Sequence, residues 1–423
     1  MVDNRRAATH RVVMTGMGVL SPNGKGVREF WESTVAGRSG IRRIDSFDVD
    51  GLPSQIAGQV RGLDPLEFMP NREVKNVSRA VPMVLAAAKE ALLNARLNWR
   101  EIVEDERCEF GVIIGSGGGC IEFTERQYKN FFNNRLRQVS LYNVPSSTMG
   151  TLSSELSMAY RLYGPSHVVS TGCTSSTDAL GYAFLQLRLG RLKSVLSGGV
   201  DATVTPGTMT GFCMMKILST GWNETPGQAS RPFDRERDGF VLGEGAWMFV
   251  LERLDHALSR GAPILAEVAG YGSTCEAFHR VRLAESGREP ARAMQLAIED
   301  AGAAKDEIGY INLHGTSTQM NDRVETVAAK LCFDRRAYDV PMSSLKSMIG
   351  HPQGASGAAG IAAIVQSFQT DTLAPTINYD VFDPDCDLDY VPNTARSKRI
   401  DLALGNCLGF GSKSSALVLK RYS

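Results

Sequence analysis

Two stretches of this chain, far apart in sequence, share one pattern: a short apolar run, a turn of small residues holding one reactive side chain, and a helix rich in small apolar residues. In the first stretch the apolar run begins at Val168, the reactive side chain is Cys173, and apolar spacing over 179–189 predicts a buried helix. In the second stretch His351 precedes an Ala- and Gly-rich helix over 357–368. The repeat favours a duplicated fold whose halves meet at a shared site.

The rest of the chain alternates between segments of strand and helix character. We expect strands at 11–20, 110–114, 194–204, 246–251, 264–271, 308–313, 403–407 and 415–419, and helices at 29–36, 73–97, 143–163, 290–301 and 321–332. This alternation predicts an α/β protein with largely buried sheets. The 423 residues exceed one typical domain. We expect a disordered lead-in over 1–10, an N-terminal half over 11–255 and a C-terminal half over 256–423.

Composition excludes several classes of protein. Lys plus Arg and Asp plus Glu both number 46, so no net charge directs the chain to nucleic acid or to a membrane. The eight cysteines are scattered without C-x-x-C spacing, which argues against zinc and against a disulfide framework. The sequence contains no run of 18 apolar residues and no secretory h-region near its start. We therefore expect a cytoplasmic protein.

A glycine-rich turn, Gly115-Ser116-Gly117-Gly118-Gly119, follows the predicted strand at 110–114. Such a turn can cradle a phosphate. This one lacks both the Walker lysine and the dinucleotide-binding spacing, so it does not favour a nucleotide.

Cys173 stands where a strand turns into a helix. At a helix N-terminus the unpaired N–H groups and the helix dipole favour negative charge, and we expect them to lower the thiol pKa. The alternative is an inert core cysteine, because free cysteine is among the most buried residue types.

Two of the six histidines also follow strands. His314 precedes a hydroxyl-rich loop, and His351 comes five residues after Lys346. One histidine in such a position is more often structural, but two histidines and a cysteine at three such junctions favour an active site. A thiolate beside two imidazoles suits acyl transfer from a thioester, since the thiolate can hold the acyl group and the imidazoles can donate to a developing oxyanion.

The sequence resembles the elongating β-ketoacyl-acyl-carrier-protein synthases, which are condensing enzymes of the thiolase superfamily. The matching motifs are Thr171–Ser175, Ser197–Asp201, Arg231–Phe240, His314–Thr318, Lys346–His351 and Gly409–Gly411. They follow the family's order from about residue 11 to the C-terminus. The resemblance implies the thiolase fold, in which two pseudo-repeated α/β halves form a layered αβαβα core.

The resemblance also implies roles for single residues. Cys173 carries the acyl group, and His314 and His351 bind the malonyl thioester oxygen and stabilise the enolate. Lys346 supplies positive charge near them. The N–H groups of Cys173 and Phe410 form the oxyanion hole, and the Phe410 side chain gates the pocket.

Further roles are implied around this centre. Thr316 and Thr318 hydrogen-bond the phosphopantetheine arm, and Glu325 organises the site from behind. Thr148 and Met149 approach the pocket floor at a dimer interface. No metal and no resident cofactor are implied, because loss of CO2 drives bond formation and the carrier protein brings the arm.

Three departures favour the ketosynthase alpha subunits of type II polyketide synthases over the fatty-acid enzymes. They are the run Gln319–Thr326, the loop around Leu408 and Lys413, and the segment Phe278–Leu283. Leu408 stands where the fatty-acid enzymes have an aromatic ring. Alpha subunits pair with a chain-length factor, a homologue without the active cysteine. We expect such a heterodimer or a homodimer, and an acidic acyl carrier protein docked on Arg72 and Lys75.

Other functions stay open at this point. The first is a homodimeric fatty-acid elongation enzyme, and the second is a non-catalytic partner resembling a chain-length factor. A degradative thiolase has a second cysteine as base where this chain has histidine. A cysteine hydrolase needs a path for water, and the Lys346/His351 motif fits neither of these two classes well.

Overall fold

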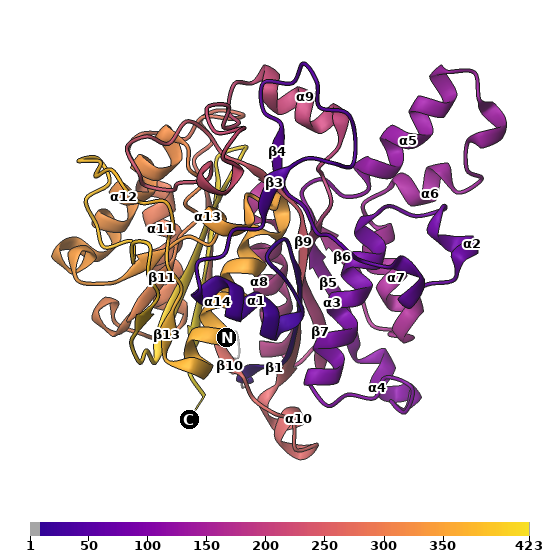
Figure 1. The fold of residues 1–423 in the computed structure, drawn as a ribbon. Coiled ribbons are helices and arrows are strands. Elements are labelled where there is room, and N and C mark those ends of the chain that lie inside the picture. Colours follow the sequence, from indigo (N-terminus) through magenta and orange to yellow (C-terminus); the bar gives the residue numbers. More distant parts are fainter. Residues whose placement is uncertain (1–8, 423) are drawn as a thin grey trace.

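The central sheet is built from one strand arrangement used twice (Figure 1). The computed structural model describes residues 9–422. The first half contributes β1 (Val12–Ser21), β5 (Phe110–Gly115), β6 (Ser166–Val169), β7 (Ser194–Asp201) and β9 (Gly245–Arg253). The second half contributes β10 (Ala266–Cys275), β11 (Tyr310–Asn312), β12 (Met342–Ser343), β15 (Leu402–Gly409) and β16 (Lys413–Lys420).

The strand orders of the two halves correspond one to one. They run β1-β9-β7-β5-β6 and β10-β16-β15-β11-β12, so in each half the first strand in sequence pairs with the last. In both halves the outer three strands are parallel and the remaining pairs are antiparallel. The halves join where β1 pairs with β10 over Val12–Met14. The predicted duplicated α/β thiolase fold is confirmed.

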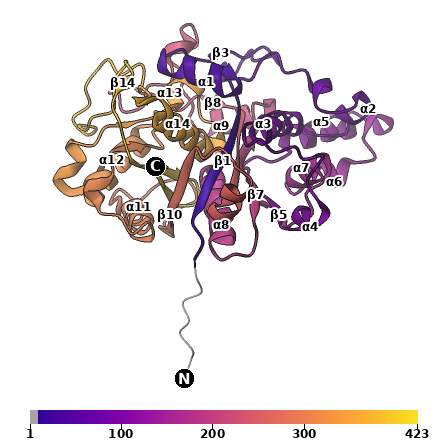
Figure 2. The same cartoon turned by 90° about the horizontal axis from the view of Figure 1, so that it is seen from below.

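Two buried helices lie between the strands of the two halves. Helix α8 (Ser175–Arg188) packs on β5 and β7 and also on β10 and β16, while α14 (Ser356–Thr370) packs on β11 and β15 and also on β7 and β9. Both lie near the centre of the molecule in Figure 1, and Figure 2 shows α14 near the middle with α8 toward one side of the body. They contact each other closely because Gly357 carries no side chain toward Thr177. Their first turns therefore meet at one place.

Outer helices cover the other faces. Helix α3 (Ala80–Asn94) covers β1 and β9, and α11 (Arg288–Asp300) covers β10 and β16, with α12 (Gln319–Phe333) beside it. The other helices are α1 (Gly26–Val35), α2 (Asn71–Val74), α4 (Glu104–Cys108), α5 (Ile121–Phe132), α6 (Asn143–Ser147), α7 (Thr151–Tyr160), α9 (Pro206–Met214), α10 (Leu254–Ser259) and α13 (Lys346–Ile349). The short strands are β2 (Gly24–Lys25), β3 (Ile41–Arg43), β4 (Ile56–Gly58), β8 (Leu242–Gly243), β13 (Thr372–Leu373) and β14 (Arg396–Ser397).

Two segments predicted as single helices are each divided in two. The segment 73–97 contains the end of α2 and the whole of α3. Between these helices the Ser78 hydroxyl accepts a hydrogen bond from the N–H of Ala80. Such a local side-chain bond competes with the backbone bonds that would continue the helix. The segment 143–163 contains α6 and α7, separated where Thr148 adopts an extended conformation with ψ 143°.

The start of the chain was predicted to be disordered over 1–10. Residues 1–8 of that prediction lie outside the described part of the structure. The N–H of His10 donates to the carbonyl of Arg188 at 2.9 Å. Within residues 9–422, no helix combines the length and apolar character needed to cross a membrane.

Candidate active site

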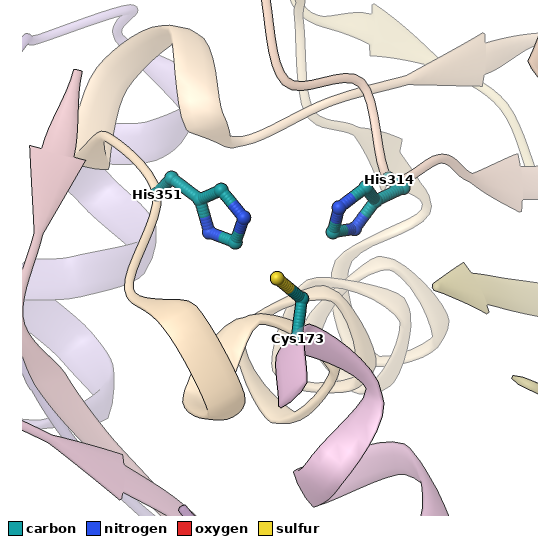
Figure 3. Close-up of side chains that lie close together, drawn as sticks. All are labelled: Cys173, His314 and His351. Atoms are coloured by element: carbon teal, nitrogen blue, oxygen red, sulfur yellow. The ribbon is translucent and has the colours of Figure 1, made fainter. Parts of the chain in front are cut away.

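Three reactive side chains converge from the two halves of the fold. Cys173 lies in the turn before α8, His314 follows β11, and His351 precedes α14. All three are buried, and their ligand-type atoms lie within 4.8 Å of one another. Figure 3 shows the Cys173 sulfur directed between the two imidazole rings. The structure thus brings together the three residues that the sequence analysis singled out.

The turn that presents Cys173 is fixed by local backbone geometry. Gly172 adopts a left-handed conformation with φ +73°, which glycine tolerates without steric cost. The N–H of Thr171 donates to the Ser175 hydroxyl at 2.9 Å, closing the turn onto the first residue of α8. Small residues with short hydroxyls therefore suit this position better than larger side chains.

The Nδ1 atoms of both histidines face donors behind the site. The backbone N–H of Gln353 donates to Nδ1 of His351 at 3.2 Å, and Nζ of Lys346 lies 3.4 Å from Nδ1 of His314. Because a backbone N–H and an ammonium only donate, each Nδ1 is an acceptor. Burial and the Lys346 charge hold the pKa of both histidines well below the usual value. Both rings are therefore neutral and carry their proton on Nε2.

Burial dominates the titration of the thiol. It raises the pKa of Cys173 to about 11, while the N–H of Phe410 and the Lys346 charge lower it only in part. The expectation of a lowered thiol pKa is corrected, because loss of hydration outweighs the local donors. The thiol of Cys173 therefore keeps its proton at neutral pH.

Buried carboxylates anchor the His314 loop from behind. Glu325 on α12 accepts the N–H groups of His314 and Gly315, each at 2.7 Å, and Asn406 donates to it as well. Burial raises the pKa of Glu325 to about 7. Asp322 accepts the N–H of Thr316 at 3.0 Å. Glu325 thus holds the loop and does not line the cavity.

A cavity of about 230 Å³ opens beside the three reactive residues. Its wall is largely apolar and includes Cys173, Ile217, Phe240, Val281, Arg282, Leu283, His314, Thr316, Thr318, Met320, Asn321, His351, Gln353, Leu408, Gly409 and Phe410. The predicted substrate-binding residues Thr316, Thr318 and Leu408 and the predicted gate Phe410 all belong to this wall. The hydroxyls of Thr316 and Thr318 lie 2.9 Å apart.

Four predicted residues lie away from this cavity. Thr148 is exposed and Met149 is half-buried, and the Met149 side chain packs against Gly119. Arg72 in α2 and Lys75 just after it are exposed, and Arg72 forms an ion pair with Glu73 at 3.2 Å. The single chain therefore does not place Thr148 or Met149 at the cavity floor.

The glycine-rich turn after β5 is occupied by a carboxylate of the protein itself. Asp201, at the end of β7, accepts from the Ser116 hydroxyl and from the N–H groups of Gly117 and Gly118, all at 2.8 Å. It also accepts from the N–H of Gly354 at 2.6 Å, three residues after His351. Sequence reasoning missed this link, although the two glycine-rich motifs that it joins were both visible.

A cysteine and two histidines are also ligands that zinc accepts. Binding a metal here would require each ring to give up its Nε2 proton, whereas the donors facing Nδ1 hold that proton on Nε2. The donors behind the site thus favour hydrogen bonding to an oxygen over metal binding.

Comparisons with known proteins agree with this arrangement. The sequence profile described as "Beta-ketoacyl synthase, N-terminal domain" matches residues 9–257, and that of the "C-terminal domain" matches residues 265–380. The tetracenomycin polyketide synthase ketoacyl synthase alpha subunit of Streptomyces glaucescens is 43% identical, with 98% of each chain covered. A 3-oxoacyl-[acyl-carrier-protein] synthase 2 of a Synechocystis species is 37% identical, with 97% of this chain and 98% of that protein covered.

Solved structures give the same result. A type II polyketide synthase ketosynthase in complex with its acyl-carrier protein superposes with a TM-score of 0.90 at 32% identity, covering 98% of this chain and 100% of that one. The ishigamide ketosynthase/chain length factor superposes with a TM-score of 0.91 at 32% identity and the same coverage. Both sequence profiles match this chain, and so do relatives of nearly equal length, and the fold and the cysteine–histidine–histidine centre agree with those matches. The chain therefore belongs to the β-ketoacyl synthase family.

Proposed function

We propose that this chain condenses malonyl-acyl-carrier-protein with an acyl group held on Cys173, elongating a chain in a type II polyketide system. The observation that carries the proposal is the pair of neutral imidazoles, each with its Nε2 proton available, on either side of a buried thiol. The 43% identity to a polyketide ketosynthase alpha subunit supports this pathway. The fatty-acid alternative is supported by the 37% identity to a 3-oxoacyl-[acyl-carrier-protein] synthase 2.

In the first half-reaction Sγ of Cys173 attacks the acyl thioester. A new carbon–sulfur bond forms, the bond to the carrier's sulfur breaks, and the carrier thiol leaves with the proton of Cys173. The N–H groups of Cys173 and Phe410 are suited to stabilise the tetrahedral oxyanion, since backbone donors fixed before reaction need no reorganisation. Thr316 and Thr318 would bind the phosphopantetheine arm.

In the second half-reaction the malonyl thioester oxygen accepts from Nε2 of His314 and of His351. The bond to the carboxylate breaks, CO2 leaves, and its electron pair forms an enolate that these donors and Lys346 stabilise. The enolate carbon then attacks the acyl carbonyl, and Cys173 leaves as a thiolate. These steps need no metal and no resident cofactor.

We also propose a chain-length factor homologue as partner, with a second copy of this chain as the alternative. The known ishigamide ketosynthase/chain length factor supports this pairing. Strand β6 ends the sheet, and the segment from α5 to α6 exposes large apolar side chains at Tyr128, Phe131, Phe132, Leu136, Leu141, Tyr142 and Val144. Thr148 and Met149 follow this exposed segment and lie away from the cavity, so a partner seated there would cover them.

The decisive experiment is intact mass of the protein after incubation with malonyl carrier protein, beside the Cys173→Ala variant. An adduct that requires Cys173 and grows by malonate-derived units is the expected result. An adduct only in the presence of a co-purified homologue identifies an obligate heterodimer. If no adduct forms under either condition, the proposal is contradicted and a non-catalytic partner is favoured.

We also propose that the enzyme is cytoplasmic, and the eight free thiols support this expectation.

A further inference from the structure

One polar side chain in the cavity wall has no assigned task. Gln353 lines the cavity with Cys173 and His351, among mainly apolar neighbours such as Ile217 and Phe240. Its Nε2 is shielded from solvent and has no hydrogen-bond partner in the described part of the protein. Buried amides are normally paired, and an unpaired one calls for an explanation.

The backbone holds Gln353 in place on both sides. Its φ of +46° lies in the left-handed region, which is costly for a residue with a side chain. Its own N–H donates to His351, and the next N–H, that of Gly354, donates to Asp201 at 2.6 Å. A side chain on Gly354 would place its Cβ 2.2 Å from the N–H nitrogen of Gly117. The backbone of Gln353 is therefore fixed beside the reactive centre, and its side chain lines the cavity from there.

A carboxamide in this place can recognise a carbonyl oxygen of the substrate. The reacting thioester oxygen already has donors in Phe410 and the histidines, so Gln353 is free for a second oxygen. Two sources exist: the 3-oxo group of an acyl chain and an amide carbonyl of the pantetheine arm. Gln353 approaches from the Asp201 side, whereas Thr316 and Thr318, suited to the arm, come from the loop before α12.

We propose that Gln353 donates a hydrogen bond to the 3-oxo oxygen of the acyl chain on Cys173 and thereby selects unreduced chains. This inference rests on the proposed function and adds the substrate class to it. A site with a donor for an oxygen discriminates against the analogue that lacks the oxygen, because the donor is then left unpaired. One such neutral bond corresponds to about a fivefold to tenfold preference.

The test uses two thioesters that differ only at carbon 3, acetoacetyl-pantetheine and butyryl-pantetheine. Intact mass gives the rate at which each acylates Cys173. The native protein should react about fivefold to tenfold faster with the acetoacetyl thioester, after correction for the reactivity of each thioester with free cysteine. Gln353→Met, which keeps the length of the side chain, should lose that preference. Gln369→Leu, at the exposed end of α14, is the control and should keep it.

A second arm separates the two oxygen sources. The same two acyl groups, acetoacetyl and butyryl, are carried on ethanethiol, which lacks the amides of the pantetheine arm. A preference that persists there, and that Gln353→Met removes, supports recognition of the chain. If Gln353→Met slows both pantetheine thioesters equally and leaves both ethyl thioesters unchanged, the arm is the partner and the proposal fails. Equal rates for both thioesters in the native protein also overturn it. Acylation by no thioester at all contradicts the proposed function itself. Unfolding curves of each variant exclude misfolding as the cause.

Discussion

At the scale of single residues, Cys407 occupies a position that the reaction does not explain. It is buried, and its Sγ lies 3.3 Å from Nδ1 of His314 and 3.1 Å from the carbonyl oxygen of Cys173. The thiol is thus packed between the histidine and the nucleophile. Burial raises the pKa of Cys407, so it is present as a thiol that can donate to one of these acceptors.

Replacing Cys407 tests this contact. Cys407→Ala removes a donor from the carbonyl of Cys173 and leaves Nδ1 of His314 with Lys346 alone, and we expect decarboxylation of malonyl carrier protein to slow about tenfold, because a lost buried hydrogen bond costs on the order of 1–3 kcal/mol. Cys407→Ser keeps a donor and should retain most of the rate. Release of CO2 measures the step. Equal rates in the two variants would show that a donor at this position does not contribute to the step.

The buried histidines also predict how stability depends on pH. In the unfolded chain a histidine has a pKa near 6.5, whereas burial holds the folded pKa of His351 well below it. Below about pH 6.5 the unfolded state therefore binds a proton that the folded state does not. Stability from this source is fully present above that pH and falls by about 1.4 kcal/mol per pH unit below it. Glu325 acts in the opposite direction, since its folded pKa of about 7 exceeds its ordinary value.

Comparing the native protein with a variant isolates the contribution of His351 to the pH dependence of stability. His351→Asn keeps an acceptor for the Gln353 N–H but does not titrate, so its free energy of unfolding should fall less steeply between pH 6 and pH 5, by up to about 1.4 kcal/mol. Glu325 is present in both proteins and cancels. Denaturant unfolding at each pH provides the values, and His167→Asn, at an exposed position, serves as control. A slope equal to that of the native protein would mean that His351 is protonated in the folded state.

At the scale of elements, the contact between α8 and α14 sets the geometry of the site, because the two helices begin beside Cys173 and His351. At Gly357 a Cβ would lie 1.9 Å from the Thr177 hydroxyl oxygen of α8. The helices therefore approach one another only because glycine is present there.

Gly357→Ala should destabilise the protein by about 1–3 kcal/mol through overpacking. It should also slow condensation, since α14 must move away from α8. Gly211→Ala in α9 is the matched control: no atom lies within 4 Å of that Cβ, and helix propensity predicts a gain of up to about 1 kcal/mol. Denaturant unfolding gives the free energy of unfolding of each variant, and condensation rates measured beside it show whether activity falls as well. Similar behaviour of both variants would contradict close packing at Gly357.

At the scale of the whole molecule, the carrier protein must bring its arm to the cavity from outside. The sequence has equal numbers of acidic and basic residues, so docking of an acidic carrier depends on a local basic patch. Arg72 and Lys75 are exposed near α2, but Glu73 offsets part of the charge of Arg72.

We therefore expect Lys75→Glu to weaken transfer from the carrier protein more than Arg72→Glu does. The combined variant should lose about tenfold in kcat/KM at low salt, with a smaller loss at high salt, where surface charges are screened. Transfer from a free pantetheine thioester should be unchanged. Arg28→Glu, exposed on α1, is the control for a general change in charge. Equal losses in the three single variants, Lys75→Glu, Arg72→Glu and Arg28→Glu, would place the docking surface elsewhere.

The sequence by itself determined the duplicated α/β fold, the family and the three residues at the centre. These follow from local patterns, since apolar spacing specifies strands and helices and a small-residue turn places one reactive side chain at its end. Local spacing failed at Ser78 and Thr148, where single residues interrupt segments that read as continuous helices.

Only the tertiary structure decided what surrounds the reactive atoms. The donors behind His314 and His351, the carboxylate of Asp201 in the glycine-rich turn and the unpaired amide of Gln353 all depend on segments far apart in the chain. The raised pKa of Cys173 depends on the same packing. Hydrogen bonds and burial depend on which groups are close in space, so the charge and the proton positions of this site are set by the folded arrangement of the two halves.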